Sequence, residues 1–186
     1  YGRRRVGKSF LINQFFDDKF DFKLVGDNRL SKDEQLFNFS DELKRQSGKD
    51  INIPKSWREA FFQLRDYLES FTDEQKHIIF FDEMPWLDNQ KSGFLPAFEY
   101  FWNSFGAAKN NLICIVCGSA TAWLVDNFDQ NKGGLFNRQN CRIYLEPFTL
   151  RETEQFLITQ KNIQWSRYDI CECYMILGGI PYYLNQ

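Results

Sequence analysis

The amino-terminal part of the sequence has glycines, a lysine and a serine at a spacing that suits an anion. Residues 2–9, Gly-Arg-Arg-Arg-Val-Gly-Lys-Ser, fit the pattern G-x-x-x-x-G-K-[S/T] at every fixed position. Glycines let backbone N–H groups approach a phosphate closely, and a helix that begins there directs its positive end at the same anion. Lys8 would reach the β- and γ-phosphates of a nucleotide, and the Ser9 hydroxyl would bind Mg²⁺. The residues predicted to bind the nucleotide here are Gly2, Arg3, Arg4, Arg5, Val6, Gly7, Lys8, Ser9 and Phe10.

The three consecutive arginines inside this loop, Arg3 to Arg5, add positive charge, and no acidic residue occurs among the first ten residues. One interpretation is proximity to the phosphates. The other is a solvated basic patch that could contact nucleic acid. The residue types leave both interpretations open.

Two adjacent carboxylates, Asp82 and Glu83, follow the apolar run that begins at His77. In a parallel sheet the carboxyl ends of the strands border the ligand crevice. An aspartate there can hold the Mg²⁺ shell, and a glutamate one residue later can orient the attacking water. Two surface acids at a strand end are the alternative, but together with the phosphate loop the pair favours hydrolysis over binding alone.

Two more polar side chains have positions that suit a reacting phosphate. Ser119 comes directly after the apolar run 112–117, where it could sense the γ-phosphate or cap the helix expected over 120–125. Arg138 lies in a loop rich in glycine and asparagine, 127–140, as a solvated residue or an arginine finger.

The segments that must position these side chains alternate between strand-like and helix-like patterns. Strand-like runs cover 20–26, 77–82, 112–117 and 142–146. Helix-like segments begin after Gly7 and at the capping boxes Ser31-x-x-Glu34 and Ser56-x-x-Glu59, and others cover 92–109 and 120–125. Because the inner strands are apolar throughout, we predict a parallel sheet covered on both faces, hence an α/β fold with three layers.

From residue 147 onward the pattern predicts helices only, with a capping box at Thr149-x-x-Glu152 and a helix over 166–177. We therefore predict a nucleotide-binding core over 1–146 and the beginning of a helical lid over 147–186. A phosphate loop normally follows a central strand, and residue 1 directly precedes the first glycine. We expect that first strand upstream of this chain.

The composition excludes several classes of protein. The chain has 186 residues, a net charge of −2 and a pI near 5.5, which argues against coating nucleic acid by bulk charge. It has no apolar run of membrane-spanning length and no signal-peptide pattern. The five cysteines suggest a reducing cytoplasm. Cys114-x-x-Cys117 is better explained as buried core than as a metal-thiolate site, which needs four ligands.

Seven segments, in order along the whole chain, resemble the AAA+/STAND-type P-loop proteins of the "archaeal ATPase" family. They are G-R-R-R-V-G-K-S (2–9), I-I-F-F-D-E-M-P-W-L (78–87), A-F-E-Y-F-W-N (97–103), I-V-C-G-S-A-T-A-W-L (115–124), G-L-F-N-R (134–138), L-E-P-F-T-L-R-E-T-E-Q-F-L (145–157) and G-G-I-P-Y-Y-L (178–184).

This resemblance implies an AAA+-like P-loop NTPase fold followed by a helical lid. It makes Asp82 and Glu83 the Walker B pair, Ser119 sensor 1 and Arg138 the candidate finger. Pro181 belongs to a G-x-P element that packs near adenine in such lids. Full-length relatives often continue into a winged-helix region and a nuclease-like domain.

The functional hypothesis is a switch driven by Mg²⁺-dependent ATP binding and hydrolysis. The alternatives are a nucleotide-stabilised scaffold with negligible turnover and the ATPase module of a DNA-processing or nuclease protein. The expected partners are ATP and ADP, with self-association or a protein partner left open. DNA would bind only through regions outside this chain, and no membrane partner is expected.

Overall fold

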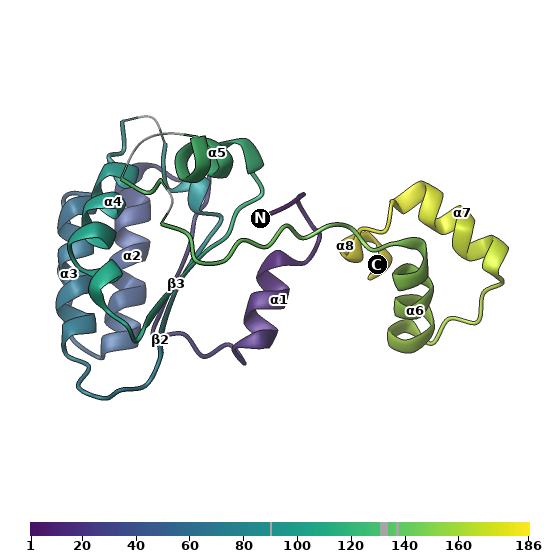
Figure 1. The fold of residues 1–186 in the computed structure, drawn as a ribbon, viewed down its shortest axis with the longest axis horizontal. Coiled ribbons are helices and arrows are strands. Elements are labelled where there is room, and N and C mark those ends of the chain that lie inside the picture. Colours follow the sequence, from purple (N-terminus) through teal and green to yellow (C-terminus); the bar gives the residue numbers. More distant parts are fainter. Residues whose placement is uncertain (90, 131–133, 137) are drawn as a thin grey trace.

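The computed structural model describes residues 1–89, 91–130, 134–136 and 138–186, in which helices alternate with strands (Figure 1). In chain order the elements are α1 (Lys8–Phe15), β1 (Phe22–Val25), α2 (Lys32–Ser47), α3 (Trp57–Glu69), β2 (His77–Asp82), η1 (Met84–Trp86), α4 (Phe94–Ser104), η2 (Gly106–Ala108), β3 (Leu112–Val116), α5 (Thr121–Val125), η3 (Asp126–Gln130), α6 (Leu150–Lys161), α7 (Arg167–Leu177) and α8 (Pro181–Leu184). None of the helices in these described ranges combines the length and apolar character needed to cross a bilayer.

The described strands form one parallel sheet in the order β1-β2-β3. The central strand β2 pairs Asp82 with Val25 of β1, and Phe81 with Val116 of β3. The predicted α/β fold with a parallel sheet is therefore confirmed. Because all three strands run the same way, their carboxyl ends lie at one edge, and the residues after each strand meet there.

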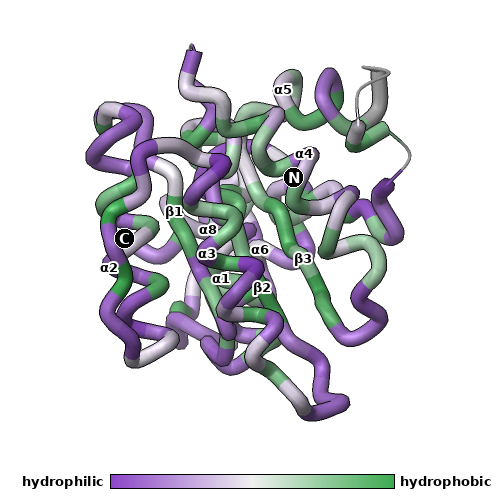
Figure 2. Tube along the Cα trace, turned by 90° about the vertical axis from the view of Figure 1, so that its left-hand side faces the viewer, coloured by the Kyte–Doolittle hydropathy of each residue, from purple (hydrophilic) through white to green (hydrophobic). Residues whose placement is uncertain are grey.

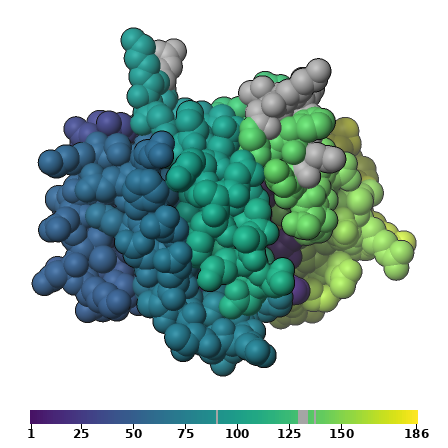
Figure 3. Space-filling view, turned by 60° about the vertical axis from the view of Figure 1, so that its left-hand side comes forward, coloured from purple at the N-terminus to yellow at the C-terminus, as the bar shows by residue number. Residues whose placement is uncertain are grey.

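Helices α2, α3 and α4 cover one face of the sheet (Figure 1), and Figure 3 shows the outer surface of α3 beside α4. The apolar stripe of α3 is buried as its spacing predicts: Trp57, Ala60, Phe61, Leu64 and Leu68. The Phe61 ring lies 6.0 Å from Phe81 of β2, and 5.7 and 5.2 Å from Phe94 and Phe101 of α4, measured between centroids. Aromatic packing of this kind makes the face a firm support for the strand ends.

The three strands are hydrophobic along much of their length (Figure 2), and their other face lies toward the amino-terminal helix (Figure 1). Helix α1 lies on this side, yet its Phe10 and Phe15 are 70% and 78% exposed. The segment between α1 and β1 contacts the sheet through Phe20, whose ring lies 5.3 Å from that of Phe80, and Lys23 lies over the Phe20 ring. The helix predicted from the spacing of its apolar residues is therefore present, but much of its apolar surface is exposed.

The helix starts follow from local side-chain chemistry. The capping boxes predicted at Ser31 and Thr149 are confirmed, with both reciprocal hydrogen bonds formed. At Ser56 only half of the box forms. The Ser56 hydroxyl accepts from the Glu59 N–H, but the Glu59 carboxylate accepts from the Lys55 N–H instead.

The strand predicted over 142–146 is wrong as a full strand. Among the residues that the structure describes, this segment forms one bridge, between Leu145 and Gly2, supported by a 2.8 Å hydrogen bond from the Leu145 N–H to the Tyr1 carbonyl. A strand is defined by its ladder, and Tyr1 and Gly2 offer this segment too few partners for one. A Cβ on Gly2 would lie 2.3 Å from the Leu145 carbonyl oxygen, so the approach requires glycine.

Two other sequence predictions need smaller corrections. The single helix expected over 92–109 is divided at Phe105 into α4 and η2. A Cβ on Gly106 would lie 2.4 Å from the Trp102 ring, and the chain turns at this close contact. The loop expected over 127–140 begins with a π-helical turn, η3, rather than irregular chain.

Helices α6, α7 and α8 pack around a small cluster of their own, with Leu157, Ile170 and Leu184 buried at its centre. Gly179 joins α7 to α8 at φ 66°, and its carbonyl accepts from the Phe148 N–H at 2.8 Å. A Cβ there would lie 2.0 Å from the Phe148 carbonyl oxygen. These helices lie beyond α1 in Figure 1, so α1 stands between them and the sheet.

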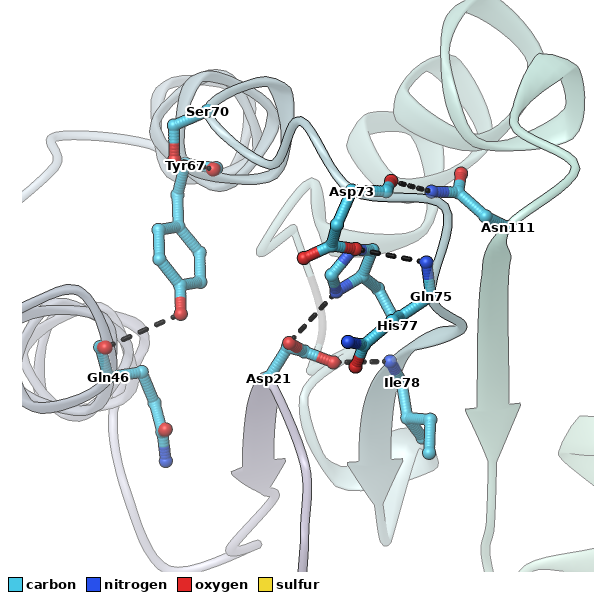
Figure 4. A network of polar contacts seen from close by, with 9 residues as sticks. All are labelled: Asp21, Gln46, Tyr67, Ser70, Asp73, Gln75, His77, Ile78 and Asn111. Atoms are coloured by element: carbon cyan, nitrogen blue, oxygen red, sulfur yellow. Dashed lines mark hydrogen bonds and ion pairs between the residues drawn. The ribbon is translucent and has the colours of Figure 1, made fainter.

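A polar network joins the amino ends of the strands (Figure 4). His77 is buried, and its two ring nitrogens lie 3.0 Å from carboxylate oxygens of Asp21 and Asp73. The other oxygen of Asp21 accepts from the Ile78 N–H at 2.6 Å. The Phe71 ring stacks on His77 at 4.1 Å. The edge of the sheet opposite the predicted site is thus fixed by side chains as well as by the ladder.

Candidate functional site

The loop over residues 2–7 leads into α1 with its backbone open to an anion. Gly7 is the N-cap at φ 93°, no side chain caps the helix, and its first turn has no acidic residue. The first N–H groups of α1 are therefore available to phosphate. Arg5 also has positive φ, 70°, a conformation that is unfavourable for a residue with a Cβ and that tertiary contacts must stabilise.

Lys8 is buried within this loop, and its Nζ donates a 2.9 Å hydrogen bond to the Arg3 carbonyl. The cation is thus directed back into the curve of the loop rather than into solvent. Val6 is also buried, whereas Arg3 and Phe10 are exposed and Ser9 is half-buried.

Asp82 ends β2 at the same edge of the sheet. It is 6% exposed, and its Oδ1 accepts from the Glu83 N–H at 2.9 Å. The pKa of the neighbouring Cys117 thiol reflects its burial and the charges near it. Burial, the larger cause, and the Asp82 charge together raise its pKa to about 12, against the opposing effect of the Lys8 charge. The charges of Lys8 and Asp82 therefore both act on the Cys117 thiol.

Glu83 makes two contacts with Ser119. Its Oε2 accepts from the Ser119 N–H at 3.0 Å and from the Ser119 hydroxyl at 2.9 Å. Ser119 does not cap α5, because Ala120 is the N-cap of that helix and no side chain caps it. Of the two roles considered for Ser119, the structure favours a position beside the acidic pair over a helix cap.

Two glycines let the strand ends close around the acidic pair. The Gly26 N–H, after β1, donates to the Asp82 carbonyl at 2.8 Å, and a Cβ on Gly26 would lie 2.5 Å from the Glu83 carbonyl oxygen. A Cβ on Gly118, after β3, would lie 2.6 Å from the Pro85 ring. Sequence reasoning missed both residues, although a glycine directly after an apolar run was the available signal.

Two arginines of the loop contact aromatic side chains from two other segments. The Arg4 guanidinium lies 5.4 Å from the centroid of the Trp86 ring, in η1. The Arg5 guanidinium lies 4.6 Å from Tyr182 and 5.3 Å from Tyr183, and its Nη1 donates to the Tyr183 hydroxyl at 2.8 Å. These three aromatic residues were not predicted as site residues, although all lie in the motifs quoted above.

Pro181 is the first residue of α8 and directly precedes the tyrosines that Arg5 contacts.

Arg138 does not contact these residues. Its N–H donates to the Leu135 carbonyl at 3.2 Å, and the neighbouring Gly134 carbonyl accepts from Asn103 of α4. Within the described residues, no contact joins the Arg138 guanidinium to the loop or the acidic pair. Asn137 of the same motif lies outside the described residues.

This arrangement offers an anion site and a cation site side by side. Backbone N–H groups, Lys8 and the flanking arginines suit a polyphosphate, while Asp82 and the Ser9 hydroxyl suit a hard divalent cation. Mg²⁺ typically takes one or two protein oxygens and completes its shell with phosphate and water. The donor set therefore fits a metal–nucleotide complex better than a metal held by protein alone.

Comparisons with known proteins agree with this chemistry. A family model described as an ATPase domain predominantly from Archaea matches residues 1–186. Among solved structures, the chain is similar to the Walker-type ATPase PABY2304 of Pyrococcus abyssi, with a TM-score of 0.68 and 24% sequence identity. That alignment covers 98% of this chain and 59% of the other, so the chain spans less than two thirds of that relative. A search of curated proteins gave no significant match.

Proposed function

The chain belongs to the family of ATPase domains found predominantly in Archaea, and from this membership we propose that it binds ATP with Mg²⁺ and hydrolyses it to drive a conformational switch. The observation that carries the proposal is the burial of two opposite charges, Lys8 in the phosphate loop and Asp82 at the carboxyl end of β2. The buried ammonium supplies a charge for the phosphates, and the buried carboxylate supplies one for the metal.

The phosphate loop supplies the binding energy for the triphosphate. The uncapped N–H groups of α1 would bind the phosphate oxygens, and the Lys8 ammonium, which donates one hydrogen bond to the Arg3 carbonyl, has two further donors for the β- and γ-phosphates. Ser9 and Asp82 would hold Mg²⁺. When bound, this ion would neutralise the negative charge that develops on the phosphate oxygens. Pro181, at the start of α8, would pack near the adenine.

Glu83 is the proposed residue that orients the attacking water. In the structure its carboxylate accepts from Ser119, so Ser119 can position it and can respond to the γ-phosphate next to it. Arg138 is proposed to stabilise the transition state from a neighbouring molecule. Among the described residues no contact joins its guanidinium to the site, which is consistent with a finger that completes the site only on assembly.

One observation favours a second candidate, a nucleotide-stabilised scaffold. Two hydrogen bonds from Ser119 occupy one oxygen of the Glu83 carboxylate. Because a glutamate held in this way is less free to orient water, ATP hydrolysis would be slow. The two functions share the binding step and differ in the chemical step alone.

The test measures both steps on the same protein. Calorimetry with Mg·ATP and with ATP plus a chelator gives the affinity and its metal dependence, and phosphate release gives the turnover. The switch predicts metal-dependent binding with turnover, and the scaffold predicts binding without turnover. Absence of nucleotide binding would contradict both candidates.

A further inference from the structure

A carboxylate outside the acidic pair joins two helices next to it. Asp88 follows η1, and its Oδ1 accepts from the Leu95 N–H of α4 at 3.3 Å, while its Oδ2 accepts from the Trp123 indole N–H of α5 at 3.1 Å. We propose that Asp88 is a positioning residue for ATP hydrolysis and acts through Trp123. It holds Ser119, just before α5, beside the Glu83 carboxylate. The inference rests on the proposed function, because it gives Asp88 a part in the chemical step.

The α4 end of this bridge belongs to the packed core. Gly93 is the N-cap of α4 and has no side chain to accept from the first N–H groups of the helix. The Asp88 carboxylate supplies an acceptor there, and its negative charge suits the amino end of a helix. Phe94 and Phe98 of α4 are buried, and so is Leu87, directly before Asp88. The carboxylate is therefore fixed relative to the core.

The α5 end of the bridge has less support of its own. The helix covers five residues, Thr121–Val125, and its N-cap residue makes no side-chain hydrogen bond to it. A helix this short depends for its position on contacts with other segments. Trp123 packs against the core with its ring and donates its indole N–H to Asp88. Because a hydrogen bond to a carboxylate is stronger than one between neutral groups, this contact fixes α5 in place.

The segments that follow β2 and β3 are thus joined twice. Next to the strand ends, Glu83 accepts from Ser119. Further along both segments, Asp88 accepts from Trp123. Loss of the outer contact would let α5 move and carry Ser119 away from the Glu83 carboxylate, while the phosphate loop would stay in place. The expected effect is therefore on the chemical step rather than on nucleotide binding.

The first experiment uses Trp123→Phe, which removes the indole N–H and keeps an aromatic ring against the core. Phosphate release should be about threefold to tenfold slower, as expected for part of one charge-assisted hydrogen bond, and Mg·ATP affinity by calorimetry should stay within about twofold of wild type. Trp165→Phe is the matched control and should behave as wild type, because Trp165 precedes α7 and is 49% exposed. Unchanged or faster turnover in Trp123→Phe, or an equal loss of affinity, would overturn the proposal.

A combination with Glu83→Gln separates positioning from a general structural defect. If Trp123 acts through Glu83, Trp123→Phe should slow the Glu83→Gln protein by no more than about twofold, whereas a general defect would slow it as much as wild type. Asp88→Asn keeps the shape and one acceptor oxygen, so its turnover should resemble that of Trp123→Phe. A loss as large as that of Glu83→Gln would make Asp88 a catalytic residue and overturn its positioning role.

Hydrogen exchange at the Ser119 amide, followed by NMR without nucleotide, tests the positioning independently of turnover. This amide donates to Glu83, so it should exchange faster in Trp123→Phe than in wild type or in Trp165→Phe. Equal exchange in the three proteins would overturn the positioning. Absence of ATP hydrolysis by wild type would overturn the proposed function, and exchange at Ser119 would then decide the positioning by itself.

Discussion

Glu83 and Ser119 lie 36 residues apart in the sequence, yet the backbone N–H and the hydroxyl of Ser119 both donate to one carboxylate oxygen of Glu83. Glu83 is also in the left-handed backbone region, at φ 46°. The pairing fixes the carboxylate beside the end of β3. Any group that competes for Ser119, such as a γ-phosphate, would change the position of the acid.

Glu83→Gln should keep Mg·ATP binding and lower turnover at least about a hundredfold. The amide fills the same space and still accepts from Ser119, but it cannot act as a base toward water. Calorimetry and phosphate release measured together separate the two effects. Loss of binding along with turnover would make Glu83 a structural residue.

Lys8→Ala should abolish ATP binding, because it removes the flexible cation at the centre of the phosphate loop. Calorimetry measures the loss directly. Lys19→Ala is the control, since Lys19 is a surface lysine paired with Asp17. Nucleotide affinity that survives in Lys8→Ala would remove the phosphate-loop assignment.

Arg138→Ala should remove a rise in specific activity that wild type shows as protein concentration increases. An arginine finger supplied between molecules raises turnover by about 10³ or more, and its loss should leave ATP affinity nearly unchanged. Phosphate release over a concentration series measures this.

A mixing experiment then tests the direction of action of Arg138. Arg138→Ala and Glu83→Gln proteins are each slow, but some mixed interfaces pair an intact arginine with an intact glutamate, so activity should partly recover. No recovery, together with concentration-independent turnover in wild type, would show that Arg138 does not act between molecules.

Cys117 should react slowly with a thiol reagent at pH 8, whereas the exposed Cys141 and Cys171 should react quickly. Burial raises the Cys117 pKa to about 12, so little thiolate forms. The raised pKa also means that the unfolded chain loses this proton first, and the free energy of unfolding should fall as pH rises above about 8.5. Burial raises the pKa of Cys114 as well, so the slow thiol that disappears in Cys117→Ser is assigned to Cys117. Rapid labelling of Cys117 in wild type would contradict its burial beside Asp82.

His77→Phe should lower the free energy of unfolding by about 1–3 kcal/mol, measured by urea denaturation. The aromatic ring can still stack on Phe71, but the contacts with Asp21 and Asp73 are lost. Asp73→Asn is the comparison. It should lower the free energy of unfolding less than His77→Phe does, because it leaves the contact with Asp21 intact, and Asp73 (53% exposed) is the more exposed of the two carboxylates (Asp21, 27%). Equal stability of wild type and His77→Phe would show that the network contributes no net stability.

The sequence predicted those features that depend on neighbours along the chain. The phosphate loop, the acids after β2 and the serine after β3 each belong to short patterns with a fixed local geometry. The apolar runs around them also predicted the parallel sheet. The segment 142–146 has an equally good local pattern, but a ladder needs a partner, and Gly2 provides a single bridge.

The contacts between distant segments could not be read in this way. Arg5 and Tyr183 are 178 residues apart, and their meeting depends on how α6–α8 pack against the core. Trp86 and Cys117 likewise gain their positions from neighbouring strands rather than from sequence neighbours. From residue type alone, the loop arginines were expected to face either phosphate or solvent. Residue type did not indicate that they would contact aromatic rings.

The polar network at His77 has a consequence for the opposite end of β2. His77 and Asp82 are the first and last residues of this six-residue strand, so Asp82 lies about 16 Å along the strand from His77. Displacing β2 by one residue would turn Asp82 to the other face and carry its carboxylate away from Lys8. The Asp21 contacts with His77 and the Ile78 N–H penalise that displacement. The position of the acidic pair therefore depends on residues at the other end of the strand, which do not contact the nucleotide.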